Sequence, residues 1–269
     1  MALHDSYARV TPFELTFSDP ARAGELAEAV LEEAEGRGVP ADDPGAFINL
    51  GTVGSFLREL RAADAPPEAI HDYGLLVYHA VHFQEAGRPL LLVSTHVARY
   101  LTGGSMGDEA PPLPAPAGYV QLPRHLFWVG GGDGGPAEAV DGFFWTLDGR
   151  GILRVLLATG LRDDRPGLAA VSVPEAPWAD AGSWLDADVR GEGRQDFATT
   201  LPGGELEGLY SFTAAGEVLK LAARVFAYVH RHPGAVEDAD GTSLPAADRA
   251  PGEPAPTSLP YRKVVLQDA

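Results

Sequence analysis

Short apolar runs separated by glycine-containing turns fill the middle of the chain, from Gly118 to Val173. One of these turns is Asp148-Gly149, the dipeptide that tight type I′ hairpins prefer, and the runs between the turns have the length of strands. The pattern predicts an antiparallel meander of four strands. An apolar and aromatic hairpin over residues 119–129 and 140–147 lies at its centre.

Apolar residues at helical spacing dominate the N-terminal third of the chain. The first helix is expected to start with Pro20 in its first turn and to stop at Gly36 and Gly38. Thr52 is the expected cap of a second helix, and a third helix is expected to end at Gly87. The predicted elements are helices over residues 20–34, 53–60, 66–86 and 97–101, and a buried strand over residues 90–93.

The C-terminal part of the chain combines one amphipathic helix with a long polar stretch. A strand is expected over residues 205–212 and a helix over residues 214–231, whose apolar positions recur at helical spacing. Residues 233–269 are rich in Pro, Ala and Asp, which is typical of an extended arm, but the chain closes with a strand-like run over residues 261–266.

These elements predict an α+β fold. A single domain over residues 1–232 would contain a helical layer (about 18–102), a largely antiparallel sheet (about 117–212) and the long helix over 214–231, and the arm would follow it. The apolar sequence Phe143-Phe144-Trp145 must place neighbouring aromatic rings on opposite faces of a strand. Either helices cover both faces of the sheet, or one face is an exposed recognition surface.

The composition argues against several kinds of site and partner. The chain of 269 residues contains no cysteine, which excludes disulfides, thiolate nucleophiles and cysteine-bound zinc. Its formal net charge of −18 argues against nucleic acid as a partner. No apolar run is long enough to span a bilayer, so we expect a soluble, cytoplasmic protein that does not act on membranes.

Two glycine-rich motifs resemble known signatures only in part. Gly103-Gly104-Ser105-Met106-Gly107 matches the G-x-S-x-G pattern that in the α/β-hydrolase family holds a serine nucleophile between a strand and a helix. Here a helical segment precedes it and a proline-rich segment follows, so a loop is expected. The glycines of residues 130–135 are followed by a strand instead of the helix that a dinucleotide site needs, and no cofactor is predicted.

The helix over residues 66–86 carries the best candidates for acid–base or metal chemistry. His79, His82 and Glu85 are spaced three residues apart, and histidine with carboxylate at helical spacing can ligate a metal. A further protein ligand, from elsewhere in the chain, would come from His96, from His125 or from the acidic turn at residues 163–164. The alternative is an ordinary polar helix face.

The leading functional hypothesis is a non-enzymatic interaction or assembly protein that binds a protein partner or forms a homo-oligomer. It depends on the aromatic sheet and on a terminal strand that could add to the sheet edge of a neighbour. The alternatives are a metal-dependent hydrolase on the helix over 66–86 and a small-molecule binding module. The candidate contact residues are Phe127, Trp128, Phe144, Trp145, Tyr261, Val264 and Leu266.

Overall fold

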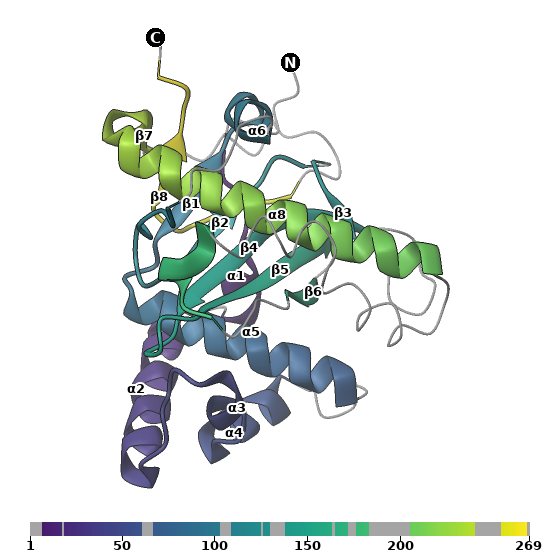
Figure 1. Ribbon diagram of the computed structural model, residues 1–269. Coiled ribbons are helices and arrows are strands. Elements are labelled where there is room, and N and C mark those ends of the chain that lie inside the picture. The colour runs from purple at the N-terminus through teal and green to yellow at the C-terminus, as the bar shows by residue number, and fades with distance from the viewer. Residues whose placement is uncertain are drawn as a thin grey trace.

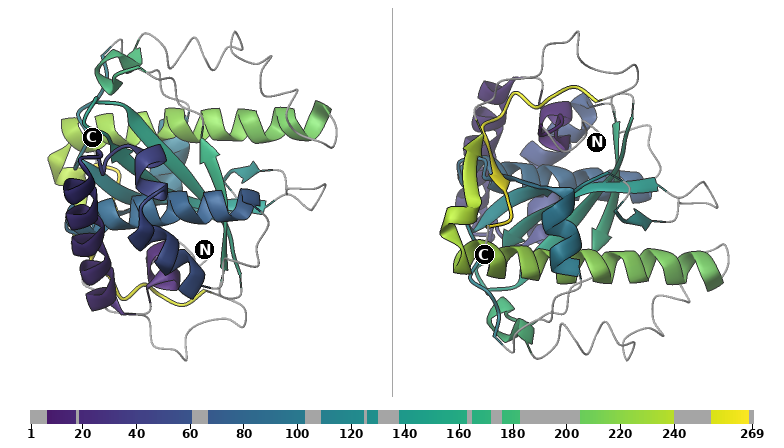
Figure 2. Two further views of the ribbon diagram at one scale, coloured as in Figure 1. Left: turned by 90° about the horizontal axis from the view of Figure 1, so that it is seen from below. Right: turned by 90° about the horizontal axis from the view of Figure 1, so that it is seen from above.

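The computed structural model shows an α+β protein with one mixed sheet between two layers of helices (Figures 1 and 2). It describes residues 7–17, 19–60, 67–102, 109–124, 126–129, 138–162, 165–171, 176–182, 205–239 and 254–267. The helices are α1 (Pro12–Thr16), α2 (Pro20–Arg37), α3 (Pro44–Ile48), α4 (Gly51–Glu59), α5 (Pro67–Glu85), α6 (Thr95–Thr102) and α8 (Glu205–Arg231), with short 3₁₀ turns η4 (Trp178–Asp180) and η5 (Pro233–Ala235). The strands are β1 (Leu90–Val93), β2 (Ala117–Gln121), β3 (Trp128–Val129), β4 (Glu138–Leu147), β5 (Leu153–Arg162), β6 (Arg165–Val171), β7 (Val236–Ala239) and β8 (Tyr261–Val264).

The sheet follows the order β6-β5-β4-β2-β1-β8-β7, and β3 pairs with β4 outside this path. The predicted four-strand meander is confirmed, because β2, β4, β5 and β6 are antiparallel neighbours. Its first hairpin is shorter than predicted. Strand β2 ends at Gln121, just before Pro123, because proline has no N–H to donate to the ladder, and β3 resumes pairing only over two residues.

Helix α2 begins and ends close to where the sequence signals predicted. The Asp19 carboxylate accepts a hydrogen bond from the Ala21 N–H (2.9 Å) and caps α2. At the other end Gly38 adopts a left-handed conformation (φ 64°) that closes the last turn. Helix α4 differs from the prediction: it starts at Gly51, one residue before the expected cap Thr52, and a side chain of α2 satisfies its first amides.

The strand predicted over residues 205–212 is wrong, because this segment forms the first turns of α8. Its apolar residues Leu206, Leu209 and Tyr210 suit a helix as well as a strand. Extending an existing helix adds one hydrogen bond for each residue ordered, whereas a separate strand needs a new partner. The longer helix is therefore favoured.

Helices cover both faces of the sheet, which is the first of the two arrangements that the alternation of aromatic residues allows. On one face, Phe143 and Trp145 pack in a core with Phe226 of α8. On the other face, Phe144 packs with Tyr119 and with Phe83 of α5. Figure 2 shows α8 and α5 on opposite sides of the sheet.

The helical segment 18–102 does not form a single layer. Helices α2 to α5 build one core, whereas Val97, Ala98 and Leu101 of α6 belong to the core under α8. The reason is topological: β1 and β2 are parallel, and a parallel pair needs a crossover over one face of the sheet, which α6 provides.

The C-terminal strand lies inside the sheet of its own chain. Strand β8 is parallel to β1 on one side and antiparallel to β7 on the other. The described part of the predicted arm is therefore not an extended tail but contributes two strands. Arg262 and Lys263 of β8 stand opposite Asp238 and Glu237 of β7, and opposite charges on facing positions favour this register.

Candidate functional site

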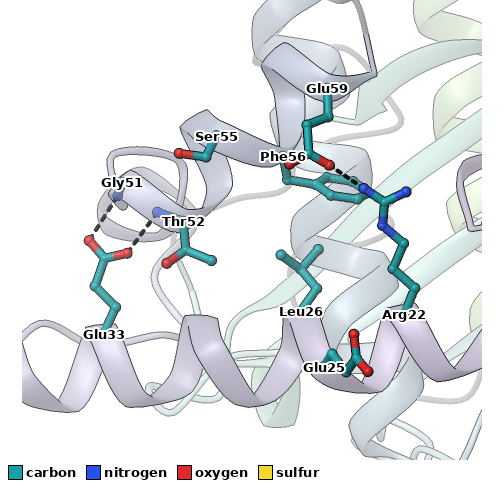
Figure 3. Close-up of a pocket in the computed structure, with 9 residues that line it drawn as sticks. All are labelled: Arg22, Glu25, Leu26, Glu33, Gly51, Thr52, Ser55, Phe56 and Glu59. Atoms are coloured by element: carbon teal, nitrogen blue, oxygen red, sulfur yellow. Dashed lines mark hydrogen bonds and ion pairs between the residues drawn. The ribbon is translucent and has the colours of Figure 1, made fainter.

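An open groove lies between α2 and α4 on the helical side of the molecule (Figure 3). Its volume is about 560 Å³. Leu26 and Phe56 contribute apolar surface, and the remaining lining is polar or charged. The groove is lined by Arg22, Glu25, Leu26 and Glu33 from α2 and by Gly51, Thr52, Ser55, Phe56 and Glu59 from α4.

One end of the groove is closed by the carboxylate of Glu33. Its two oxygens accept hydrogen bonds from the Gly51 N–H and the Thr52 N–H, both at 2.8 Å. The Thr52 side chain and these two amides lower the pKa of Glu33 from 4.5 to about 2. Glu33 is therefore a permanent anion that caps α4 and links it to α2.

Arg22 occupies the other end of the groove. Its guanidinium forms an ion pair with Glu59, and its central carbon lies 5.8 Å from the centroid of the Phe56 ring. The Phe56 ring in turn stacks on Phe17, with 5.1 Å between centroids. Figure 3 shows the Arg22 side chain reaching across the groove from α2 to α4.

The solvent-exposed face of α2 is strongly acidic, and one of its glutamates, Glu25, also lines the groove. Its sequence places glutamates at i, i+3, i+7 and i+10, a spacing that aligns side chains along one side of a helix. All four are exposed. We call this row the glutamate ridge; it consists of Glu25, Glu28, Glu32 and Glu35.

The three candidate metal ligands, His79, His82 and Glu85, do not converge on a common site. His79 is only 3% exposed, and its Nδ1 lies 2.8 Å from the Thr146 hydroxyl of β4. His82 Nε2 lies 3.2 Å from the Ala41 carbonyl oxygen in the segment between α2 and α3. Glu85 is exposed at the end of α5. Within the described part of the chain, no group of three or more His, Asp or Glu side chains is arranged to hold a metal ion.

Burial determines the protonation of both histidines. It lowers the pKa of His79 from 6.5 to about 3, with smaller contributions from neighbouring His82 and Arg154. It also lowers the pKa of His82. Both imidazoles are therefore neutral at pH 7, and each is engaged in a hydrogen bond within the protein.

The predicted contact residues separate into two sets. Phe144, Trp145 and Val264 are buried in the two cores and cannot meet a partner in this fold. Phe127 and Tyr261 are half-buried against the same cores. Trp128 and Leu266 are 46% and 41% exposed, the former on β3 and the latter just after β8.

A buried polar network that sequence reasoning missed joins the N-terminal segment to the sheet. Arg9, only 1% exposed, donates to Asp141 Oδ1 (2.8 Å) and to the Leu122 carbonyl oxygen (2.7 Å). The second Asp141 oxygen accepts from Tyr119 and Gln121. No local pattern around Arg9 marks it, because its partners are more than one hundred residues away. The network is structural, since its members bond to one another.

Several predicted features fall outside the described residues: the segment 103–107 with its serine, the glycine loop 130–136, His125 and the acidic turn at 163–164. His96, the remaining candidate ligand, is exposed on α6. Among the helices that are described, none is long and apolar enough to cross a membrane.

Comparison with protein-family models, with curated proteins and with solved structures finds no match to this chain.

Proposed function

We propose that this protein is a non-enzymatic interaction or assembly protein, and that it contacts a partner protein through the groove between α2 and α4. The observation that carries the proposal is the groove itself, which is open, has an apolar floor of Leu26 and Phe56, and is bordered by charged side chains from two helices. Helix-lined grooves of this kind are a common way of recognising a protein segment.

The buried histidines and carboxylates are held in hydrogen bonds and ion pairs within the fold, and this supports a binding role. His79 is neutral and bonded to Thr146, His82 faces a backbone carbonyl, and Asp141 is paired with Arg9. Asp148, also buried, accepts from the Ile152 N–H (2.8 Å) and pairs with Arg154. Groups held in this way maintain the fold and have no free acceptor or donor directed into the groove.

A protein segment fits the groove better than a small molecule does. Small-molecule sites are usually enclosed and mostly apolar, so that they bury most of the ligand surface. Here four of the nine lining residues are charged, and the groove is open to solvent. The sheet aromatics Phe144 and Trp145 and Val264, the last residue of β8, are buried, so the proposed contact lies on the helical layer.

Photo-crosslinking tests this proposal. A photoreactive benzoylphenylalanine replaces the exposed Ser55 in the groove of the full-length protein, and the matched control carries it at exposed Arg99 on α6. After irradiation in cells, we expect a covalent product heavier than the monomer from position 55 and not from position 99. Mass spectrometry of the product then distinguishes a different partner from a second copy. Absence of a product, or equal products from both positions, contradicts the proposal.

A further inference from the structure

Two arginines on the C-terminal half of α8 have no carboxylate partner within the described part of the chain. Arg224 donates to the Thr102 carbonyl oxygen (3.1 Å), and its buried Nε has no hydrogen-bond partner. Arg231 is exposed and takes part in no ion pair. Arg9 and Arg37, in contrast, each pair with a carboxylate. The positive charges of Arg224 and Arg231 are therefore not neutralised within the described structure.

The two arginines share one side of α8 with a lysine. Lys220, Arg224 and Arg231 are four and seven residues apart, a spacing that aligns side chains along a helix. We call these three residues the cationic stripe, which covers about 16 Å of helix. Lys220 pairs with Glu217 (3.3 Å), but no Asp or Glu occurs over residues 218–236. The stripe therefore carries excess positive charge in a chain whose formal net charge is −18.

The cationic stripe faces away from the core. Its residues are partly or fully exposed, whereas Val225 and Phe226, on the other side of α8, are completely buried. Arg99 of α6 is separate from the stripe. It lies about 100° around α6 from Tyr100, whose ring meets Tyr228 of α8 with 6.3 Å between centroids.

The glutamate ridge on α2 is complementary to this stripe in charge and in length. Its four glutamates are exposed, and none of them takes part in an ion pair within the part of the chain that the structure describes. The ten-residue separation of Glu25 and Glu35 corresponds to about 15 Å of helix. The seven-residue spacing of the two arginines recurs between Glu28 and Glu35. Two ion pairs can therefore form when the two helices lie side by side.

The ridge and the stripe lie on opposite sides of the sheet. Helix α2 packs on α5 in one core, whereas α8 belongs to the core on the other face. Figure 2 shows α5 and α8 on these two sides. The outer surfaces of the two layers point away from each other, so the ridge and the stripe cannot meet within one copy of the chain.

We propose that the protein self-associates by docking the cationic stripe of one copy on the glutamate ridge of a second copy. Charge complementarity selects this occupant, because the chain itself carries exposed carboxylates at the spacing of the arginines. The contact is separate from the groove, which Glu28, Glu32 and Glu35 do not line. It joins two different surfaces, so each copy can contact two others.

The net charge of −18 repels the copies from each other. At 0.1 M salt the Debye length is about 10 Å, so the repulsion between distant charges is largely screened. Oppositely charged groups in contact are screened less. Ion pairs between exposed side chains are individually weak, so the association should be reversible and sensitive to salt.

Sedimentation velocity of the full-length protein at about 0.1 M and about 1 M salt tests the proposal. We expect the average mass to rise with concentration at the lower salt and to approach that of the monomer at the higher salt. The stripe variant, Arg224→Glu with Arg231→Glu, should associate about tenfold or more weakly, and so should the ridge variant, Glu28→Lys with Glu35→Lys. A mixture of the two variants should regain association, because each supplies the intact surface that the other lacks.

Matched controls make the same charge changes at exposed positions elsewhere. Arg58→Glu with Arg99→Glu corresponds to the stripe variant, and Glu85→Lys with Glu109→Lys corresponds to the ridge variant. Both should leave the association within about twofold of that of the unmodified protein. Circular dichroism verifies that each variant is folded. Arg231→Glu alone has no ion pair within the described structure to lose, so weaker association of this variant reports the docking contact itself.

The inference is overturned if the unmodified protein stays monomeric up to about 0.1 mM at the lower salt. It is also overturned if the controls weaken association as much as the stripe variant does, or if the mixture of the two variants stays monomeric. Failure of this inference is distinguishable from failure of the proposed function, because the stripe variant leaves the groove unchanged and crosslinking from position 55 reports the groove alone.

Discussion

The neutral, buried His79 predicts a specific loss of stability in mild acid. Its pKa is about 3 in the folded protein and 6.5 when it is exposed. Below pH 6.5 the unfolded chain therefore binds a proton that the folded chain does not, and the free energy of unfolding falls with pH until about pH 3. Between about pH 7 and about pH 4.5 the difference amounts to roughly 2–3 kcal/mol.

The variant His79→Asn isolates this contribution. Asparagine can still bond to the Thr146 hydroxyl, which now lies 2.8 Å from His79 Nδ1, but it does not titrate. Any cost of the smaller side chain is present at both pH values and cancels in the comparison. The remaining histidines and the carboxylates titrate in both proteins, so their contributions cancel as well.

Urea unfolding, followed by tryptophan fluorescence at both pH values, measures the effect. We expect the unmodified protein to lose roughly 2–3 kcal/mol more than His79→Asn between about pH 7 and about pH 4.5. If both proteins lose the same free energy, His79 is protonated in the folded state or is not buried. The argument from burial would then be refuted.

Three further predictions follow from close packing, buried charge and sheet order. Gly118→Ala should destabilise the protein by about 3 kcal/mol or more, since a Cβ would lie 2.1 Å from a facing indole carbon, whereas Gly36→Ala in open space should be neutral or stabilising; thermal unfolding compares the two. Arg9→Met leaves Asp141 buried without its cation and should cost about 3–5 kcal/mol, and adding Asp141→Leu should recover part of this in urea unfolding. Deleting residues 261–269 removes a strand from between β1 and β7, and we expect loss of cooperative unfolding by circular dichroism instead of a well-folded monomer.

Features that depend on a few neighbouring residues could be predicted from the sequence. Asp19, Pro20 and Gly38 bound α2 because capping and left-handed glycine act within one helical turn. The hairpin between β4 and β5 was predicted in the right place, since it joins adjacent segments, but the predicted tight turn at Asp148-Gly149 is wrong: the connection runs over residues 148–152, with Gly151 in the left-handed conformation (φ 77°). The same local reasoning failed over residues 205–212, where apolar spacing suits both a strand and a helix.

The candidate site could be predicted only in part. The spacing of Glu25, Glu28, Glu32 and Glu35 places them on one face of a predicted helix, but of these four only Glu25 lines the groove. The sequence instead favoured His79 and its neighbours as the candidate site, because histidines at helical spacing can bind a metal or act in acid–base catalysis. The burial and the hydrogen bonds of these histidines depend on tertiary contacts, which residue spacing along the helix does not determine.

By itself the sequence determined most of the helices and strands, residues 205–212 excepted, and it determined that neighbouring aromatic residues lie on opposite faces of the sheet. The tertiary structure alone decided three further things: α6 joins α8, β8 enters the sheet beside β1, and α4 packs near α2 so that Phe56 and Glu59 meet Arg22. The physical reason is the distance along the sequence over which each kind of interaction acts. Caps, turns and periodicity act over a few residues, whereas the groove results from packing between segments whose separation along the chain leaves no local signature.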